Sequence, residues 1–212
     1  MAKSCQKEMK KKKNINNDFT ILPSHDSYIH MKAVKHIYHY LYGTSDYKLV
    51  YQATKGPNEP VFYLDSDWAG DHNDQKSITC FVTCLLGSAI TWALHKQACV
   101  STSSTEAEFI VTATGCQEAL WLCNFFDSIQ ILIALPTPLH SDNQSAINLI
   151  TTRNVNECLK HIGTRYRFIC DCHESGCIST SYIPIDKQPA DGLTKSLSPV
   201  KFPAFSGHLG LM

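Results

Sequence analysis

The stretch VFYLDSDWAGD, residues 61–71, decides the fold that we expect for this chain. Its opening apolar run, Val61 to Leu64, leads directly into Asp65, and such a run is typical of a strand buried on both faces. Asp65 and Asp67 are two residues apart, so both side chains point to the same side of the sheet. A carboxylate inside a buried strand is costly unless a cation meets it. The stretch therefore predicts a central strand that carries a charged site.

The composition is that of a globular protein. The chain has 212 residues, of which 43% are hydrophobic and 18% are charged, and these values exclude a disordered protein. Lys and Arg total 19, as do Asp and Glu, so the net charge of +0 does not by itself indicate nucleic-acid binding. The 10 cysteines lack regular spacing and no secretory signal is found, which predicts an intracellular protein, cytoplasmic or nuclear and not secreted. No apolar run approaches the roughly 18 residues of a membrane span, so we expect no membrane partner.

Apolar periodicity and turn residues predict alternating strands and helices after the opening strand. Strands 78–86 and 88–94, joined at Gly87, form an antiparallel meander with it. Behind them we expect helix 106–126, strand 139–141, helices 143–151 and 160–174, strand 178–183 and a helical turn at 189–195. This order predicts an α/β fold with a mixed sheet flanked by helices, in which three antiparallel strands come first and parallel strands follow.

The chain also divides into segments along its length. Residues 1–22 form a polar tail with consecutive lysines at 10–13, which we expect to be disordered, with a phosphate-binding or nuclear-localisation patch as the alternative. Residues 23–60 contain an expected helix at 24–42, a short strand at 47–52 and a loop. Residues 61–198 form the predicted main domain, and 199–212 a C-terminal tail with room for one more helix.

Acidic residues fall where an α/β sheet gathers its functional groups. Asp65 lies on the first strand, Glu106 opens the long helix and Asp142 follows the fourth strand. Asp191 begins the late helical turn. The last three also have a local interpretation, because each could cap a helix, Glu106 in a capping box with Ser103. Carboxylates that converge beyond the carboxyl ends of strands repel one another unless a cation is present, and Mg²⁺ or Mn²⁺ suits such a site.

Five sequence blocks occur together in a characteristic order. They are DSDWAGD at 65–71, SSTEAEF at 103–109, SDNQSAI at 141–147, KHI at 160–162 with Arg165-Tyr166, and QPAD at 188–191 with LTK at 193–195. In this order the blocks resemble the ribonuclease H domain of copia-like retrotransposon reverse transcriptases, and the resemblance covers residues 23–211. It implies a ribonuclease H-like fold with a five-stranded mixed sheet. Residues 23–60 then correspond to a remnant of the connection that follows the polymerase, and the polymerase domain itself is missing from this chain.

The resemblance also implies the chemistry. It implies a site for two Mg²⁺ or Mn²⁺ ions whose metal ligands and catalytic residues are Asp65, Glu106, Asp142 and Asp191. Asp67 and Glu108 stay open as alternatives to the first two. Two such ions activate a water and stabilise the leaving oxygen in phosphodiester cleavage, so we expect the RNA strand of an RNA–DNA hybrid to be cut. The candidate substrate contacts are Ser104, Asn143, Gln144 and Lys195. For the three uncharged residues among them, helix capping is an equal alternative.

The competing interpretation is a catalytically silent retrotransposon remnant with at most weak nucleic-acid binding. The presence of all four acids favours an active endoribonuclease, whereas the lack of a polymerase motif, which would hold the hybrid, favours the remnant. A transposase or integrase shares the general fold, but its glutamate normally comes last among the site residues. Here Glu106 comes second, which argues against that class.

Overall fold

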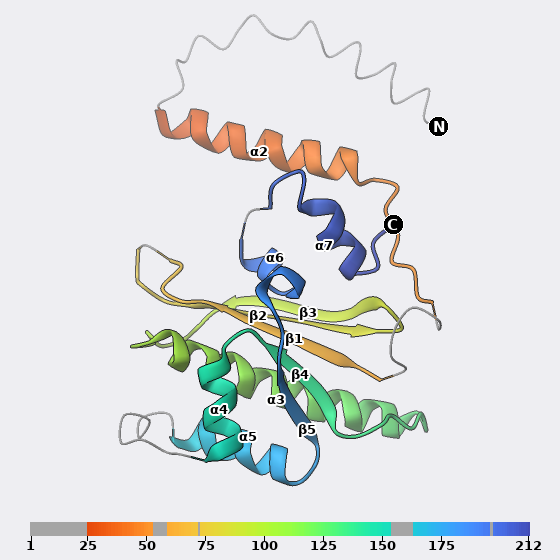
Figure 1. Ribbon diagram of the computed structural model, residues 1–212. Helices are drawn as coiled ribbons and strands as arrows, with labels where there is room; N and C mark the ends of the chain where they lie inside the picture. The colour runs from red at the N-terminus through yellow and green to blue at the C-terminus, as the bar shows by residue number, and fades with distance from the viewer. Residues whose placement is uncertain (1–24, 53–58, 72, 154–162, 196) are drawn as a thin grey trace, which may run out of the picture. The chain divides into compact units, whose positions relative to one another are not determined.

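The computed structural model describes residues 25–52, 59–71, 73–153, 163–195 and 197–212, and the chain divides into two compact units, 1–47 and 48–212 (Figure 1). In the first unit, helix α2 spans His25–Gly43 and confirms the helix predicted over 24–42. The predicted disordered tail, residues 1–22, lies outside the described residues. None of the helices in the described ranges has the length and apolar character of a bilayer-spanning segment.

The second unit is built on a mixed sheet of five strands. They are β1 Val61–Asp67, β2 Ile78–Leu85, β3 Ser88–Lys96, β4 Thr137–Ser141 and β5 Ile178–Tyr182, in the spatial order β3-β2-β1-β4-β5. The first three pair antiparallel, and β4 and β5 extend the sheet in parallel, which confirms the predicted arrangement. The strand predicted over 47–52 is wrong, because only an isolated bridge joins Leu49 to Leu211. The pairing stops there because Gly210, next to Leu211, has a φ of 71° and is therefore not extended.

Helices cover both faces of the sheet (Figure 1). One face carries α3 Ser104–Ser128, α4 Gln144–Thr152 and α5 Gly163–Glu174, and the other carries α6 Asp191–Thr194 and α7 Phe202–His208. A short 3₁₀ turn, η3 Ile185–Lys187, leads from β5 to α6. Neighbouring side chains of β2 point to opposite faces of the sheet and belong to two different apolar clusters. Phe81 belongs to the cluster with α3 and α5, whereas Cys80 belongs to the cluster with Ala190 and Leu209.

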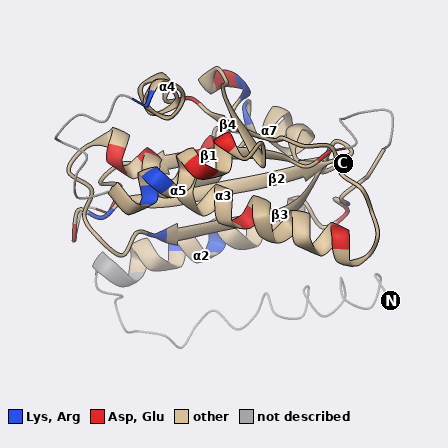
Figure 2. Cartoon of the chain, turned by 90° about the horizontal axis from the view of Figure 1, so that it is seen from below, with Lys and Arg blue, Asp and Glu red and all other residues tan. Residues whose placement is uncertain are grey.

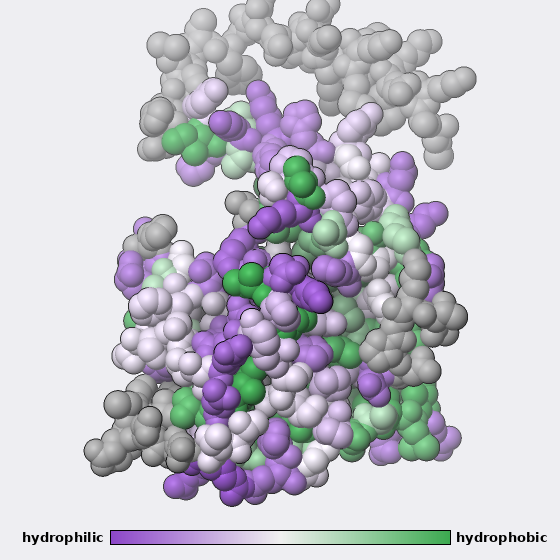
Figure 3. Space-filling model, viewed as in Figure 1, coloured by the Kyte–Doolittle hydropathy of each residue, from purple (hydrophilic) through white to green (hydrophobic). Residues whose placement is uncertain are grey.

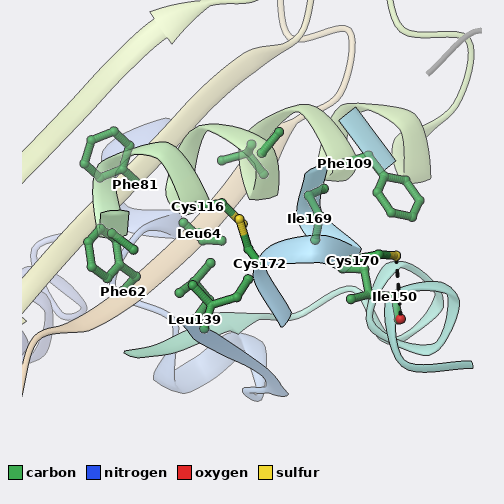
Figure 4. Close-up of a cluster of buried hydrophobic side chains, with 14 of the residues drawn as sticks. Phe62, Leu64, Phe81, Phe109, Cys116, Leu139, Ile150, Ile169, Cys170 and Cys172 are labelled. Carbon is green, nitrogen blue, oxygen red and sulfur yellow. Dashed lines mark hydrogen bonds between the residues drawn. The ribbon is translucent and has the colours of Figure 1, made fainter. Parts of the chain in front are cut away.

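The larger core lies between the sheet and the helices α3 and α5. Figure 4 shows Leu64 and Leu139, from neighbouring strands, gathered against Cys116 of α3 and Cys172 of α5. Gly115 makes this packing close, since a Cβ built there would lie 2.7 Å from the Leu64 side chain. The helix α3 can therefore approach β1 closely, and its first turns come within reach of the strand's polar end.

The far end of α3 has an exposed apolar surface. Trp121 and Phe125 stack with their ring centroids 5.7 Å apart, and both are about half exposed. Leu132, in the connector to β4, is 95% exposed. Figure 3 shows hydrophobic surface at the lower right of the view, over this end of the helix. The patch lies at the opposite end of α3 from the acidic residues of its first turns.

Candidate active site

The register of β1 and β4 brings two of the predicted acids together. Leu64 and Ser141 form the last pair of the parallel ladder. Asp65 follows Leu64 within β1, and Asp142 follows Ser141 directly after β4, so the two acids lie side by side where the strands stop pairing. Asp65 is 4% exposed, and Asp142 is half-buried. Figure 2 shows acidic residues close to the labelled strands β1 and β4.

Glu108 of α3 completes a group of three carboxylates with these two. One carboxylate oxygen from each of Asp65, Glu108 and Asp142 lies within 4.8 Å of the others. Among the described residues this is the only such group of metal-ligating side chains. Oxygen ligands at this spacing suit a hard divalent cation.

The structure does not bring Glu106 to this group. Its carboxylate accepts hydrogen bonds from the backbone N–H of Thr102, at 2.6 Å, and from the Thr102 hydroxyl, at 2.8 Å. The Ser103 hydroxyl in turn accepts from the Glu106 backbone N–H at 3.1 Å. Ser103 is therefore the predicted N-cap, whereas the Glu106 carboxylate bonds Thr102 and not the Ser103 N–H of a full capping box. Glu108, which the sequence left open as the alternative, lies in the acid group where Glu106 was expected.

Polar neighbours hold the Glu108 carboxylate in place. One of its oxygens accepts from the Ser66 hydroxyl at 2.7 Å and from the Ser66 backbone N–H at 3.2 Å, and the other accepts from the Ser141 hydroxyl at 3.3 Å. Burial raises the pKa of Glu108 to about 8, and the charges of Asp65 and Asp142 add to this rise against the opposing hydrogen bonds. At neutral pH, without a cation, this carboxyl group holds its proton.

The fourth acid, Asp191, lies beside the group on α6. It forms an ion pair with Lys195, one turn further along the chain. The Thr194 hydroxyl donates to the Asp65 carboxylate at 2.7 Å. Burial is the main cause that raises the pKa of Asp65 and of Asp142, and the negative charge of Asp191 raises both further. Asp191 therefore acts on Asp65 and Asp142, and these two in turn act on Glu108.

Three predicted substrate contacts lie at the starts of the helices α3 and α4. Ser104 and Gln144 are exposed at the starts of α3 and α4. The Asn143 side-chain oxygen accepts from the Ala146 backbone N–H at 2.9 Å, so Asn143 is the N-cap of α4. Because Asn143 occupies the N-cap position, the alternative in which Asp142 caps this helix is wrong.

Capping was also considered for Asp191 and is wrong as well. The N-cap position of α6 belongs to Ala190, and no side-chain cap hydrogen bond forms there. The fourth predicted substrate contact, Lys195, is exposed at the other end of the same short helix.

Two contacts that sequence reasoning missed fix the segment that carries Asp191. The Gln188 side-chain amide donates to the Leu64 carbonyl at 2.8 Å, and the Cys80 thiol donates to the Ala190 carbonyl at 3.5 Å. Gln188 stands in the QPAD block, which was a signal for it, whereas nothing in the sequence pointed to Cys80. Both contacts tie the start of α6 to the strands β1 and β2.

Comparison with known sequences finds relatives among transposon polyproteins. The chain is 34% identical over 184 residues to the retrovirus-related Pol polyprotein from transposon RE2 of Arabidopsis thaliana, a match that covers 86% of this chain and 12% of that protein. It is 34% identical over 175 residues to the polyprotein from transposon TNT 1-94 of Nicotiana tabacum, covering 82% of this chain and 13% of that one. The chain thus spans only about an eighth of the length of these relatives. No family model matches it.

Comparison with solved structures supports the fold. The chain is similar to LC11-RNase H1, solved in complex with an RNA/DNA hybrid, with a TM-score of 0.50 and 15% sequence identity. The match covers 64% of this chain and 93% of that chain. Together with the strand order, it confirms the ribonuclease H-like fold expected from the sequence.

Proposed function

The chain is homologous to a segment of retrotransposon Pol polyproteins and has a ribonuclease H-like fold, and from this premise we propose that it is a metal-dependent ribonuclease H that cleaves the RNA strand of RNA–DNA hybrids. The observation that carries the proposal is the convergence of Asp65, Glu108 and Asp142 at the edge where β1 and β4 stop pairing. Asp191 adds a fourth negative charge next to this group.

The donor set fits a hard divalent cation. Three carboxylates that lie within 4.8 Å of one another repel when ionised. Burial, with a smaller contribution from this repulsion, raises the pKa of Glu108 to about 8. A divalent cation would relieve the repulsion, and Mg²⁺ or Mn²⁺ binds such oxygen ligands. We propose two ions, held by Asp65, Glu108 and Asp142 with Asp191.

The protein's own groups orient these ligands. When bound, such ions activate a water and stabilise the leaving oxygen of a phosphodiester. Thr194 holds one oxygen of Asp65 through its hydroxyl, and Ser66 and Ser141 hold the two oxygens of Glu108. Because these hydrogen bonds come from β1, β4 and α6, the carboxylates are fixed in place by the fold before any ligand arrives.

The substrate contacts follow from the positions around the acids. Ser104 and Gln144 lie exposed at helix starts, where hydroxyl, amide and backbone N–H groups can donate to phosphate or sugar oxygens. The Asn143 side-chain oxygen serves α4, so its amide nitrogen is the part that would contact the hybrid. The relatives are much longer than this chain, and we propose that a polymerase domain is the partner that holds the hybrid.

The test is cleavage of an end-labelled RNA–DNA hybrid in Mg²⁺ or Mn²⁺ by the chain and by Asp142→Asn. We expect metal-dependent cutting of the RNA strand alone, which the substitution abolishes because it removes one carboxylate of the group. Asp127→Asn is the matched control, since Asp127 is exposed near the far end of α3. It should cleave as the unchanged chain does.

Other outcomes separate the alternatives. Folded protein that cuts nothing even in Mn²⁺ would favour the catalytically silent remnant, and addition of a polymerase domain then tests whether the activity needs that partner. Cutting that survives Asp142→Asn would mean that the acids at the β1–β4 edge are not the site.

A further inference from the structure

The short helix α6 brings a positive charge into the acid group. The Lys195 ammonium forms an ion pair with Asp191. Burial raises the pKa of Asp65 and of Asp142, and in both cases the charge of Lys195 opposes that rise. The same lysine therefore interacts with three of the four acids. In the absence of metal it acts as a counter-ion supplied by the chain itself.

The position of Lys195 also allows it to leave. Its side chain is 51% exposed, and an exposed ion pair of this kind contributes little to stability. The long lysine stem can rotate into solvent at small cost, while Thr194, which precedes it, stays hydrogen-bonded to Asp65. The release of the ammonium therefore does not require α6 to move.

A bound cation and this ammonium compete for the same carboxylates. Asp191 cannot offer the same oxygen to Lys195 and to a divalent ion. Even where different oxygens are used, two positive charges within one small group repel each other. Any divalent ion that enters must therefore either displace Lys195 or bind more weakly because of it.

We propose that Lys195 is a built-in counter-cation that occupies the acid group in the metal-free protein and that a divalent ion must displace from Asp191. The inference rests on the proposed function, since it presupposes the metal site. It assigns Lys195 a role in setting metal affinity, beyond the phosphate contact expected from the sequence. The metal concentration at which the site fills is then controlled by a residue that is not a ligand.

The test measures Mn²⁺ binding to the full chain by isothermal titration calorimetry, at one fixed pH and without nucleic acid. We expect Lys195→Met to bind Mn²⁺ about two- to fivefold more tightly than the unchanged chain, because it removes a competing charge whose exposed ion pair is weak. Lys195→Arg keeps the charge and should not show this gain. Lys187→Met is the matched control, as Lys187 is exposed in the neighbouring turn η3, and its affinity should equal that of the unchanged chain.

The direction of the effect makes the test decisive. A substitution that merely damages the fold weakens metal binding, so a gain in affinity cannot be a folding artefact. If the unchanged chain binds Mn²⁺, Glu108→Gln abolishes that binding and Lys195→Met binds no more tightly, the role of Lys195 is overturned while the proposed function stands. If the unchanged chain binds no Mn²⁺ at all, both proposals fail together.

Discussion

Glu106 and Glu108 lie two positions apart on α3 and have different partners. The Glu106 carboxylate turns back to Thr102 and stabilises the start of the helix. The Glu108 carboxylate turns toward β1 and β4, where Ser66 and Ser141 donate to it. Successive helical positions are rotated by about 100°, so residues two apart face different directions. This separation makes the two glutamates a matched pair for mutagenesis.

The same chemical change at each position should therefore have opposite consequences. Glu108→Gln should lower hybrid cleavage by about a thousandfold, because a metal ligand supplies several kcal/mol of transition-state stabilisation. Glu106→Gln should leave cleavage unchanged and alter the free energy of unfolding by less than about 0.5 kcal/mol, since glutamine also serves in a capping box. Cleavage rates and urea unfolding of both variants check this. Loss of cleavage in Glu106→Gln alone would mean that the ligand is Glu106.

The sequence could not decide which of the two glutamates joins the acid group, and the reason is physical. Glu106, Glu108 and every residue between Glu106 and Ala113 are buried, so the start of α3 shows no polar face from which its rotation could be deduced. The rotation is set by the close packing of Gly115 on Leu64, a contact between distant parts of the chain. The capping box with Ser103 was readable and did indicate a local role for Glu106.

The raised pKa of Glu108 predicts how stability depends on pH. In the folded protein Glu108 keeps its proton up to about pH 8, whereas the unfolded chain releases it near the ordinary value of 4.5. The folded state therefore binds more protons between these values, and the free energy of unfolding falls as pH rises through this window. We expect the metal-free chain to lose on the order of a few kcal/mol between pH 5 and pH 8. Urea unfolding in a chelator at a series of pH values measures this loss.

Glu108→Gln is the control for this pH dependence. The amide cannot ionise, so most of the slope should disappear, and the residual slope should come from Asp65 and Asp142, whose pKa values are also raised by burial. A slope that persists unchanged in this variant would show that Glu108 is not the responsible group. Added Mn²⁺ should reduce the slope in the unchanged chain, because metal binding favours the ionised carboxylate.

At the scale of elements, α6 is too short to hold its own position. It has four residues and depends on neighbours that contact its two sides. Gln188 and Cys80 tie its start to the sheet, and Phe205 of α7 packs against Gly192. The placement of Asp191 therefore depends on α7, an element from the last few residues of the chain.

Gly192→Ala should test this dependence. A Cβ at position 192 would lie 2.3 Å from the Phe205 ring, so either the ring or α6 must move. We expect a loss of about 1–3 kcal/mol in the free energy of unfolding, together with reduced cleavage, because overpacking displaces the helix that carries Asp191. Thermal unfolding and hybrid cleavage of the variant provide the two measurements.

Gly207→Ala is the matched substitution in the same region. Gly207 lies in α7, and a Cβ there would meet nothing within 4 Å. Alanine is a better helix former than glycine, so this variant should gain about 0.5–1 kcal/mol and cleave normally. Equal losses from both glycines would indicate that α7 tolerates no change and that the Gly192 contact is not special.

The elements themselves were largely readable from local pattern. The apolar run at the start of β1 and the turn at Gly87 predicted the meander, and the start of β1 and both bounds of β2 agree with the structure to within one residue. The helix near the C-terminus was also foreseen, as α7 confirms. The contact between α7 and α6 was not predicted, because a packing interface between two short helices leaves no periodic signal in either sequence.

At the scale of the whole molecule, the second unit begins earlier than the sequence suggested. The compact unit starts at Lys48, whereas the predicted domain began at Val61. Backbone hydrogen bonds join Lys48 to Met212 in both directions, at 2.8 and 3.0 Å, and the Val50 N–H donates to the Gly210 carbonyl at 3.0 Å. We propose that residues 48–52 belong to the ribonuclease H-like domain and hold its C-terminal end.

Two fragments distinguish these boundaries. Fragment 48–212 should unfold at the same urea midpoint as the second unit of the full chain. Fragment 61–212 lacks the bonds to Gly210 and Met212 and the Ser88 hydroxyl bond to the Val50 carbonyl, so it should lose on the order of 2–3 kcal/mol. Equal stability of the two fragments would place the boundary at Val61 after all.

The dependence of Asp191 on α7 has a consequence for incomplete chains. A chain made from the N-terminus acquires Asp65, Glu108 and Asp142 well before the segment that holds α6 in position. A premature stop codon or a protease cut just before Phe202 would therefore leave the sheet, the large core and three acids in place, but would remove the α7 contact to Gly192, so that only the Gln188 and Cys80 contacts would hold the segment with the fourth acid. Such a product would look folded to most probes and yet be inert. Loss of residues 202–212 would then be enough to silence the proposed activity.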